Sequence, residues 1–414
     1  MSTVFLQGER LFDGERVITD GAALIKDGTV REVGPAEEVT RPDRPDSTEL
    51  RGETVLPGLV DAHVHLTYTE TTLRNRLEFS DPRNSLEYNT IESLGVAVEH
   101  LEKGVTAIRD IGSRRWLAVA IRDAVEDGLV AGPRIAASGP ILTVTGGLTD
   151  LYPEWIDATT EFVRHVSGPA EAREAAREQI KAGVDNVKIE ASGEWINPYS
   201  DSRTPTASPE ELAAVVDTAH ARGVRVAAHA KAAPSIENAL DAGVDTIEHG
   251  TFLDEGLMKR MREQGVPLVT TLTCYRNVLR RGTEAYPDER VEVLRREMDR
   301  HTDTVRRASE LGVQVAAGTD TGPPFSAHGH GAVADEIVHL VDVGLSPREA
   351  LQAATTTAAT AAGLEGTAGR LAPERHGDAL LVDGNPLEDP TVLQDHDRIT
   401  HVLKDGSLVK SLDD

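Results

Sequence analysis

The chain has 414 residues, 39% of them hydrophobic, which is sufficient for one large domain with a buried core and a smaller domain. Its 69 acidic and 43 basic residues give a formal net charge of -26, so its surface repels nucleic acid and anionic membranes. The single cysteine, Cys274, excludes an intrachain disulfide, and we expect it to be a small core residue rather than a nucleophile.

The N-terminal segment, MSTVFLQGERLFDG, predicts a strand and a turn. It lacks the basic region and apolar stretch of a secretion signal, and no run of the chain approaches the roughly 20 apolar residues of a membrane span. We therefore expect a cytoplasmic protein that acts on a small-molecule substrate, has no nucleic-acid or membrane partner, and forms a homo-oligomer.

Both ends of the chain have the pattern of short strands separated by turns. Residues 1–55 contain apolar runs broken at Asp13-Gly14, and residues 365–414 contain DALLVDGNPL and ITHVLKDGSLVK, with Asp-Gly and Asn-Pro as turn signals. Neither end is long enough to form a core alone. The simplest arrangement is one composite β-sandwich built from both ends.

Residues 56–364 alternate short β-runs with helical patterns, so the fold class is α/β. Eight strand–helix units over about 300 residues match a (β/α)8 TIM barrel, whose typical size is about 250 residues before insertions. Catalytic residues then lie at the carboxyl ends of the strands, and the long polar segments 66–87, 139–168, 193–207 and 273–290 would form the pocket. The expected strands lie near 56–65, 105–110, 134–138, 185–191, 224–229, 245–249, 267–272 and 314–320.

Histidines and an aspartate end several of these β-runs. His63 and His65 end the first in VLPGLVDAHVHL, and they project to the same face because alternate strand residues do so. Two such close histidines also occur by chance, but His229 in VRVAAHAK, His249 in DTIEHGT and Asp320 in VQVAAGTD end other runs. Imidazole and carboxylate groups suit zinc and similar divalent ions. The pattern predicts a metal site at the barrel mouth.

Lys188 ends the fourth β-run in DNVKIEASG. Burying an unpaired ammonium is unfavourable, and the chain contains only eight lysines. A salt-bridged or snorkelling lysine would be the ordinary interpretation. Its place among the other strand ends favours a role in the same site.

These motifs resemble those of the amidohydrolase superfamily. PGLVDAHVHL, VKIEASG, AAHAK, IEHG and AAGTD occur in the family's order, and GDALLVDGNPLED near the C-terminus is similar to its small sandwich. The chain looks most like the binuclear branch with a carboxylated lysine, near the Xaa-Pro dipeptidase (prolidase-like) and N-acyl amino acid carboxypeptidase members. The stretches TVTGG, VKI-x-ASG and IEHG-x-x-x-D support that branch.

The resemblance implies a metal-dependent hydrolase of C–N bonds with two divalent ions per chain, zinc being expected. The first two histidines and the aspartate would hold the more buried ion and the other two histidines the more exposed one, while the lysine, as N6-carboxylysine, would bridge both. The aspartate would also act as general base and then general acid. The implied ligands are His63, His65, Lys188, His229, His249 and Asp320.

The substrate-binding residues are less determined by the sequence. Tyr275 could hydrogen-bond a tetrahedral intermediate or be a packed loop aromatic. His330 matches a histidine that often follows the eighth strand in relatives, and the nearby His328 is expected to face solvent. Gly146 and Gly147 could line the pocket with backbone N–H groups.

The chain departs from its relatives at Leu148, where a histidine is common, and at Val333, where an asparagine is usual. These changes affect the substrate that the resemblance implies, but they leave the implied metal ligands intact. An imidazolonepropionase-like cyclic amidohydrolase normally needs one metal, so the lysine argues against it. An organophosphate triesterase shares the same metal centre and stays open, whereas a non-catalytic barrel homologue should have lost a ligand, and none is replaced.

The excess of carboxylates and the scarcity of lysine resemble proteins of salt-loving microbes, so we predict that molar salt stabilises the protein. Repulsion between exposed carboxylates is screened beyond about 3 Å at 1 M salt but only beyond about 10 Å at 0.1 M. The melting temperature should therefore rise along a potassium chloride series. A flat melting temperature would leave only an acidic surface.

Overall fold

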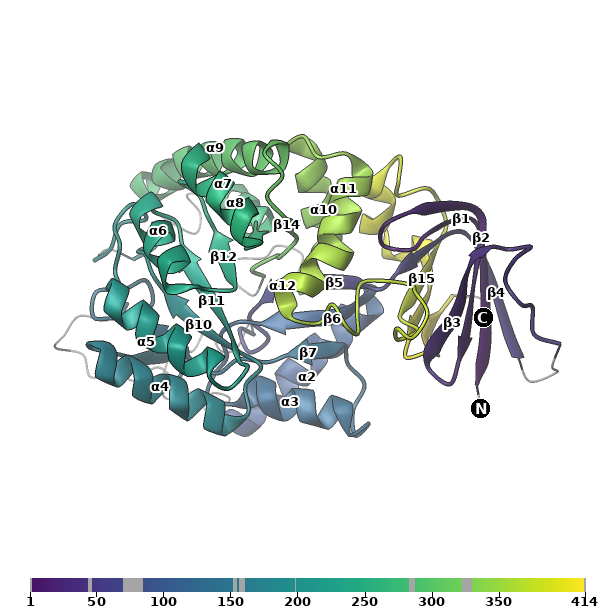
Figure 1. Cartoon of the computed structure of the whole chain (residues 1–414), viewed down its shortest axis with the longest axis horizontal. Coiled ribbons are helices and arrows are strands. Elements are labelled where there is room, and N and C mark those ends of the chain that lie inside the picture. The colour runs from purple at the N-terminus through teal and green to yellow at the C-terminus, as the bar shows by residue number, and fades with distance from the viewer. Residues whose placement is uncertain are drawn as a thin grey trace.

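The computed structural model describes residues 2–43, 47–69, 85–151, 155, 161–197, 199–282, 287–321 and 330–412. The predicted α/β fold is confirmed: Figure 1 shows helices packed around central strands, with a small β-domain on one side that contains both chain termini. His328 and parts of three predicted pocket segments, residues 70–84, 152–160 and 283–286, lie wholly or largely outside the described residues.

The small domain is a seven-stranded mixed sheet in the order β17-β16-β15-β4-β1-β2-β3. Strand β4 joins the two ends of the chain, since it pairs in parallel with β1 and antiparallel with β15. Leu6, Leu11 and Val55 from one end pack in a single cluster with Leu381 and Leu403 from the other. The strands are β1 Thr3–Phe12, β2 Val17–Lys26, β3 Thr29–Pro35, β4 Ser47–Pro57, β15 Ala379–Val382, β16 Ile399–Lys404 and β17 Ser407–Ser411.

This pairing confirms that both termini build one small β-domain, which neither could form alone because each would leave an apolar face exposed. The predicted limits of the two domains, 1–55 with 365–414 and 56–364, stay predictions.

The barrel contains a strand at each of the predicted positions. Parallel ladders join β5, β6 and β7, and a second set joins β10 to β14 in chain order. Backbone bonds link the two sets, because Ala62 N–H donates to Ala317 (3.0 Å) and Asn186 N–H donates to Ala137 (3.3 Å). The strands are β5 Leu59–Val64, β6 Val105–Asp110, β7 Arg134–Ala136, β10 Asn186–Glu190, β11 Arg225–Ala230, β12 Thr246–His249, β13 Leu268–Val269 and β14 Val315–Ala316.

Strands β13 and β14 are shorter than predicted, two residues each instead of the runs 267–272 and 314–320. The backbone enters the left-handed region at Thr271, with φ 59°, two residues after β13, and at Asp320, with φ 49°, four residues after β14. Both turns lie at the barrel mouth.

Helices cover the outside of the barrel (Figure 1). Helix α5 begins as the sequence predicts, with a capping box between Ser208 and Glu211 and with Pro209 in its first turn. A π-helix, Ala353–Thr357, separates α11 from α12, and the short strands β8 Ile141–Thr143 and β9 Val163–His165 extend the sheet beside β10. The helices are α2 Leu86–Glu102, α3 Leu117–Glu126, α4 Pro169–Ala182, α5 Pro209–His220, α6 Ala233–Ala242, α7 Glu255–Gln264, α8 Leu272–Arg281, α9 Asp288–Glu310, α10 Val333–Asp342, α11 Pro347–Gln352 and α12 Ala358–Ala362.

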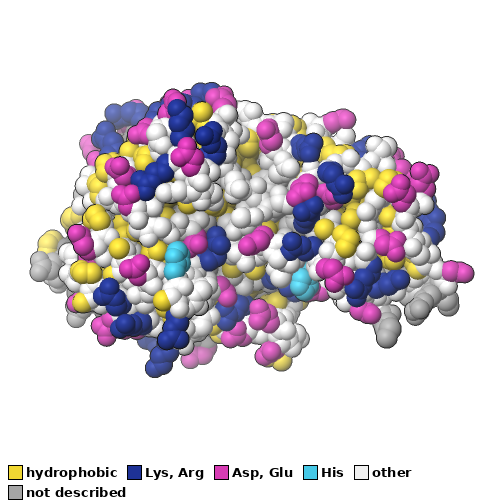
Figure 2. Space-filling view, in the orientation of Figure 1, with side chains coloured by type: hydrophobic (Ala, Val, Ile, Leu, Met, Phe, Trp, Pro, Cys, Tyr) yellow, Lys and Arg dark blue, Asp and Glu magenta, His cyan; other side chains and the backbone are white. Residues whose placement is uncertain are grey.

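The surface carries charges of both signs. Figure 2 shows acidic side chains interspersed with basic ones over one face of the molecule. Many arginines pair locally with carboxylates, as Arg306 does with Glu310 at 2.7 Å. In the part of the chain that the structure describes, no helix combines the length and the apolar character needed to cross a membrane.

Candidate metal centre

The barrel brings all of the predicted metal ligands to the wall of one cavity. They come from β5, β10, β11, β12 and the turn that follows β14, so strands distant in the sequence supply neighbouring side chains. This position agrees with the rule that sites in such barrels form at the carboxyl ends of the strands. The residues are His63, His65, Lys188, His229, His249 and Asp320.

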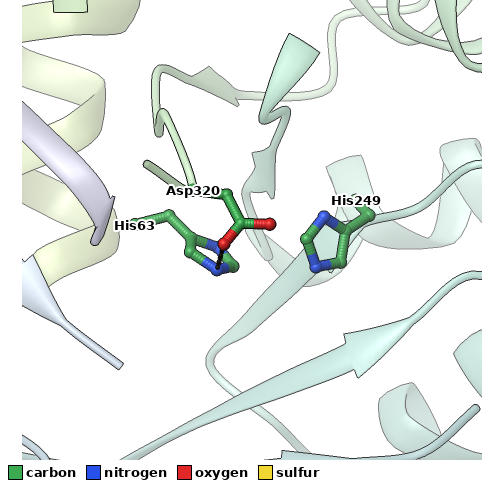
Figure 3. Close-up of side chains that lie close together, drawn as sticks. All are labelled: His63, His249 and Asp320. Atoms are coloured by element: carbon green, nitrogen blue, oxygen red, sulfur yellow. Dashed lines mark ion pairs between the residues drawn. The ribbon is translucent and has the colours of Figure 1, made fainter. Parts of the chain in front are cut away.

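Three of these side chains form the closest group. His63, His249 and Asp320 each offer a ligand atom within 4.8 Å of the others, as Figure 3 shows. Oδ1 of Asp320 lies 3.5 Å from Nε2 of His63 and 3.4 Å from Nε2 of His65. This donor set can hold a divalent metal ion.

The imidazoles of His65 and His229 extend this group at its two ends, so that the four histidine rings form a row. Ring centroids are 5.5 Å apart for His65 and His63, 5.1 Å for His63 and His249, and 4.7 Å for His249 and His229. Burial lowers the pKa of His63 to about 4 and holds the pKa values of His229 and His249 well below the ordinary value. These imidazoles are therefore neutral at physiological pH, which is the form that binds metals.

Hydrogen bonds behind the rings fix which nitrogen faces the cavity. Nδ1 of His63 donates to Oε2 of Glu248 (2.7 Å), and Nδ1 of His65 donates to the Gly112 carbonyl (2.9 Å). Nε2 of His229 donates to the Gly193 carbonyl (3.3 Å). Because these oxygens only accept, the other ring nitrogen of each histidine is left as a free ligand atom.

The backbone is strained where the ligands project. His249 has a φ of 69°, followed by Thr271 and Asp320 in the same left-handed region at the ends of the next two strands. Residues other than glycine adopt this region rarely, at a cost of about 1–3 kcal/mol each, and cluster at functional sites. The Thr271 hydroxyl also contacts Nδ1 of His249 at 2.7 Å, so the strained turn orients that ring.

Buried carboxylates hold two of these turns in place. Asp61 accepts hydrogen bonds from the backbone N–H groups of His63 (3.1 Å) and Thr319 (3.0 Å) and from the Thr319 hydroxyl (2.6 Å). Burial raises the pKa of Asp61 to about 7 despite these donors. Glu336 holds the turn after β13 through the N–H groups of Leu272 (3.0 Å) and Thr273 (2.7 Å).

Lys188 is 3% exposed, and within the described residues no ion pair is formed by its ammonium. Burial lowers its pKa to about 8, although Glu248 and Asp320 act in the opposite direction. A larger fraction of the amine is therefore neutral near physiological pH than in an ordinary lysine. A neutral amine is the form that reacts with carbon dioxide to give a carbamate.

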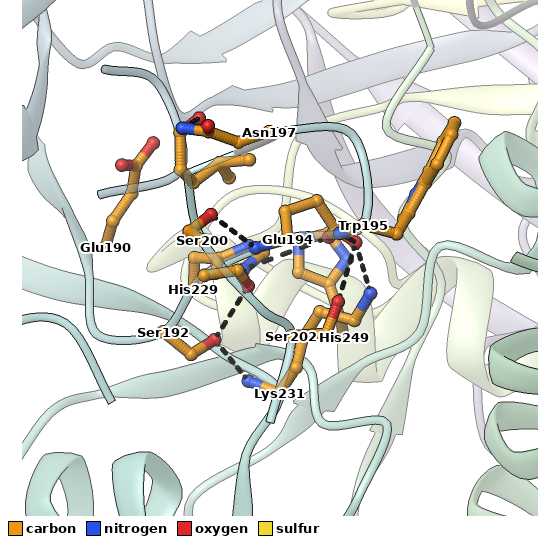
Figure 4. A network of polar contacts seen from close by, with 12 residues as sticks. Glu190, Ser192, Glu194, Trp195, Asn197, Ser200, Ser202, His229, Lys231 and His249 are labelled. Atoms are coloured by element: carbon orange, nitrogen blue, oxygen red, sulfur yellow. Dashed lines mark hydrogen bonds and ion pairs between the residues drawn. The ribbon is translucent and has the colours of Figure 1, made fainter. Parts of the chain in front are cut away.

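Lys231 behaves differently from Lys188, although both are buried. Its Nζ lies 2.5 Å from Oε1 of Glu194, as Figure 4 shows for this pair. The same Nζ lies 2.5 Å from Oε2 of Glu297 and 4.9 Å from the centroid of the Tyr275 ring. Both carboxylates neutralise it, so it is not available to bind an anion. The sequence contained a signal for this residue, since it lies two positions beyond His229 and directly after β11.

The predicted substrate residues are only partly at the cavity. Tyr275 lines it, whereas the buried His330 lies behind it and contacts the Tyr68 carbonyl at 3.1 Å. The N–H groups of Gly146 and Gly147 are bonded within their own loop, to Asp150 (2.8 Å) and to the Val144 carbonyl (2.8 Å), so they do not face a ligand.

The two departures from the relatives differ in position. Leu148 lines the cavity, while Val333 is a buried residue at the start of α10. Cys274 is not the core residue that we expected: it is half-buried and lines the cavity, because α8 begins directly after the strained Thr271. Sequence patterns also missed Tyr68, whose ring stacks on His65 with centroids 4.4 Å apart.

The remaining wall of the cavity is mainly apolar. Aliphatic and aromatic side chains from the loops after β7 and β10 and from helices α8 and α9 face the ligands, as expected for a small-molecule site. They are Ile141, Leu148, Leu151, Trp195, Ile196, Val278 and Leu294.

Comparisons with known proteins agree with this geometry. The model of the Amidohydrolase family matches residues 54–409. Ochratoxinase of Aspergillus niger is 28% identical over 423 residues, covering 96% of this chain and 84% of the relative. A solved Xaa-Pro dipeptidase with bound methionine is 30% identical with a TM-score of 0.86, covering 99% of this chain and 100% of that one.

A prolidase solved with N-methylphosphonate-L-proline is also similar, at 31% identity and a TM-score of 0.87, covering 99% of this chain and 100% of that chain. The family model spans most of the barrel and reaches into both parts of the small domain. The chain therefore belongs to the amidohydrolase family and is a hydrolase.

Proposed function

We propose that this hydrolase cleaves amide or peptide bonds, as an Xaa-Pro dipeptidase or N-acyl amino acid hydrolase, with two zinc ions bound by the six ligands. The observation that carries the proposal is the row of four imidazoles around one cavity, together with Asp320 and with Lys188, which forms no ion pair within the described residues. A Lys188 carbamate would convert an unfavourable buried cation into a bidentate anion between the two halves of this row. The similarity to a prolidase, an Xaa-Pro dipeptidase and ochratoxinase supports the substrate class.

We propose that the six ligands divide between the two ions. His63, His65 and Asp320 would hold one ion, His229 and His249 the other, and carboxylated Lys188 both. When bound, two divalent ions supply Lewis acidity that activates water and polarises the scissile carbonyl. The apolar wall excludes bulk water and packs against the substrate's side chains.

Asp320 is placed to move a proton. Its side chain is 21% exposed toward the cavity, and despite burial the neighbouring His63, His65 and Lys188 lower its pKa to about 2. It is therefore ionised at neutral pH and can accept a proton from the attacking water. Returning that proton to the leaving nitrogen completes hydrolysis, so the residue acts first as base and then as acid.

We propose that Tyr275 stabilises the tetrahedral intermediate. It is buried in the cavity wall, and within the described residues its hydroxyl makes no hydrogen bond of normal geometry. Burial raises its pKa well above the ordinary value, so the phenol stays protonated. A protonated hydroxyl can donate a hydrogen bond to an oxyanion.

The substrate class can be tested by a screen of the metal-replete enzyme against Xaa-Pro dipeptides, N-acyl amino acids, lactams and organophosphate triesters. We expect the highest kcat/KM among the first two groups. Turnover of lactams alone would favour an imidazolonepropionase-like cyclic amidohydrolase, and turnover of triesters alone would favour a triesterase. Either result would contradict the proposed function.

We predict that Lys188→Ala loses metal and activity, because the ligand between the two ions is removed. For the proposed two-metal centre, elemental analysis should give about two metal ions per chain in the wild type. The variant should contain clearly fewer. A short carboxylic acid should partly restore activity by replacing the carbamate. The matched control is Lys181→Ala on the exposed face of α4, which should keep both.

An unmodified Lys188 in the metal-loaded protein, seen by mass spectrometry under native conditions or in electron density, would contradict the bridging assignment. Full activity with a single bound ion would do the same.

We predict that Asp320→Asn lowers turnover by about 10²-fold or more, the usual scale of general acid–base catalysis, while metal content falls far less. The amide oxygen still ligates a metal but accepts no proton at neutral pH. Turnover and metal content must be measured on one preparation. If turnover and metal content fall together, Asp320 acts only as a ligand. A variant that keeps two metal ions and near-normal turnover would refute the proton-transfer role.

A further inference from the structure

One corner of the cavity wall differs from the rest because it is polar and incompletely satisfied. Glu190 lies two residues beyond Lys188 on β10, so both side chains project to the same side of the strand. In the register of β10 and β11 it is the partner of His229. Two residues of a strand span about 6.6 Å, so this carboxylate lies farther along β10 than Lys188, at the level of His229 on the neighbouring strand.

Only one oxygen of this carboxylate is used by the protein. Oε2 of Glu190 accepts hydrogen bonds from the Thr143 hydroxyl (2.5 Å) and from the Thr149 N–H (3.1 Å). Oε1 is buried and, among the described residues, makes no hydrogen bond of normal geometry. The Thr149 hydroxyl lies beside the same carboxylate and, with the donors to Oε2, acts against the rise in the pKa of Glu190 that burial causes. A buried carboxylate oxygen without a donor is costly, so its retention in a cavity wall points to a ligand that supplies the donor.

The other carboxylate of the wall does not share this property. Glu194 accepts from Lys231 at 2.5 Å and from the Trp195 N–H at 2.8 Å, so it has a cation partner inside the protein, which it shares with Glu297. Figure 4 shows this network of dashed contacts, and Glu190 stands outside it. Apart from Lys188, the described residues that line the cavity include no lysine or arginine. The charge of Glu190 is therefore without a neighbouring cation that the protein supplies at hydrogen-bond distance.

We infer that Glu190 is a specificity residue that binds a positively charged ammonium group on the acyl side of the scissile bond, with the Thr149 hydroxyl beside it. This inference rests on the proposed function and selects within it. The enzyme should prefer substrates with a free α-amino group, as in dipeptides, over N-acyl amino acids of the same size. An ammonium donates charge-assisted hydrogen bonds to a carboxylate and compensates its burial.

A purely structural role for Glu190 makes a different prediction. Its Oε2 anchors the loop that contains Leu148 and Thr149, so loss of that anchor would disturb the wall for every substrate alike. Glu190→Gln separates the two roles, because the amide oxygen can still accept from Thr143 and Thr149 while the negative charge is lost. The side-chain NH2 of the glutamine amide only donates hydrogen bonds, so it cannot bind an ammonium.

The test compares two substrates that differ only in the amine, L-Ala-L-Pro and N-propionyl-L-Pro, on the metal-replete full-length enzyme. Wild type should prefer the first. Glu190→Gln should lower its kcat/KM by about tenfold to a hundredfold, the scale of a lost charge-assisted hydrogen bond, and change that of the second by no more than about twofold. Equal losses for both substrates, or a wild type that prefers the propionyl compound, would overturn the inference.

A binding measurement keeps the inference testable if neither substrate is hydrolysed, an outcome that would count against the proposed function alone. L-Alaninamide and propionamide differ only in the α-amino group, and only the first is a cation at neutral pH. L-Alaninamide should raise the melting temperature of the wild type more than propionamide does, and Glu190→Gln should abolish that difference. Equal effects of the two amides on the wild type would refute an ammonium subsite.

Discussion

A buried ion pair between Arg109 and Glu248 supports the centre of the barrel. Arg109 on β6 reaches Oε1 of Glu248 on β12 at 2.8 Å and also donates to the carbonyls of Ala62 (2.6 Å) and Ala361 (3.2 Å). The second oxygen of Glu248 accepts a hydrogen bond from His63, so the charge pair that joins β5, β6 and β12 also orients a candidate metal ligand. Although burial raises it, Arg109 and His63 hold the pKa of Glu248 below its usual range. Removing one partner of such a pair costs about 3–5 kcal/mol, so the site and the barrel interior depend on the same contact.

The two buried lysines show how the protein treats a cation in two ways. Lys231 is neutralised by Glu194 and Glu297, and it supports the wall beneath Tyr275. Lys188 receives no such partner within the described residues and has a lowered pKa. Burial without compensation is unfavourable for a structural lysine but is useful for one that must become an anion. The difference between the pair is the physical basis for proposing carboxylation at one of them alone.

The metal ligands and the substrate wall obey different constraints. The ligands are fixed by strand ends, strained turns and hydrogen bonds behind each ring, so they tolerate little change. The wall consists of side chains from loops and from α8 and α9, and its chemistry can vary without disturbing the barrel. Leu148 and Glu190 meet on this wall, since the loop that carries Leu148 is anchored to the carboxylate through Thr149. In our proposal this variable part selects the substrate, while the ligands perform the reaction.

Local sequence patterns were enough to predict the (β/α)8 barrel, the small domain made from both ends and the polar residues at the strand ends, because strand periodicity and turn signals are local. It also placed His63 and His65 on one face, since that relation depends only on alternation along a strand. The folded structure was needed to show that Cys274 and Leu148 line the cavity and that His330 lies behind it. It also showed that the N–H groups of Gly146 and Gly147 are bonded within their own loop. Those outcomes depend on where loops fold back over the barrel and on the strained turn at Thr271, contacts between residues far apart in the chain that no local pattern records.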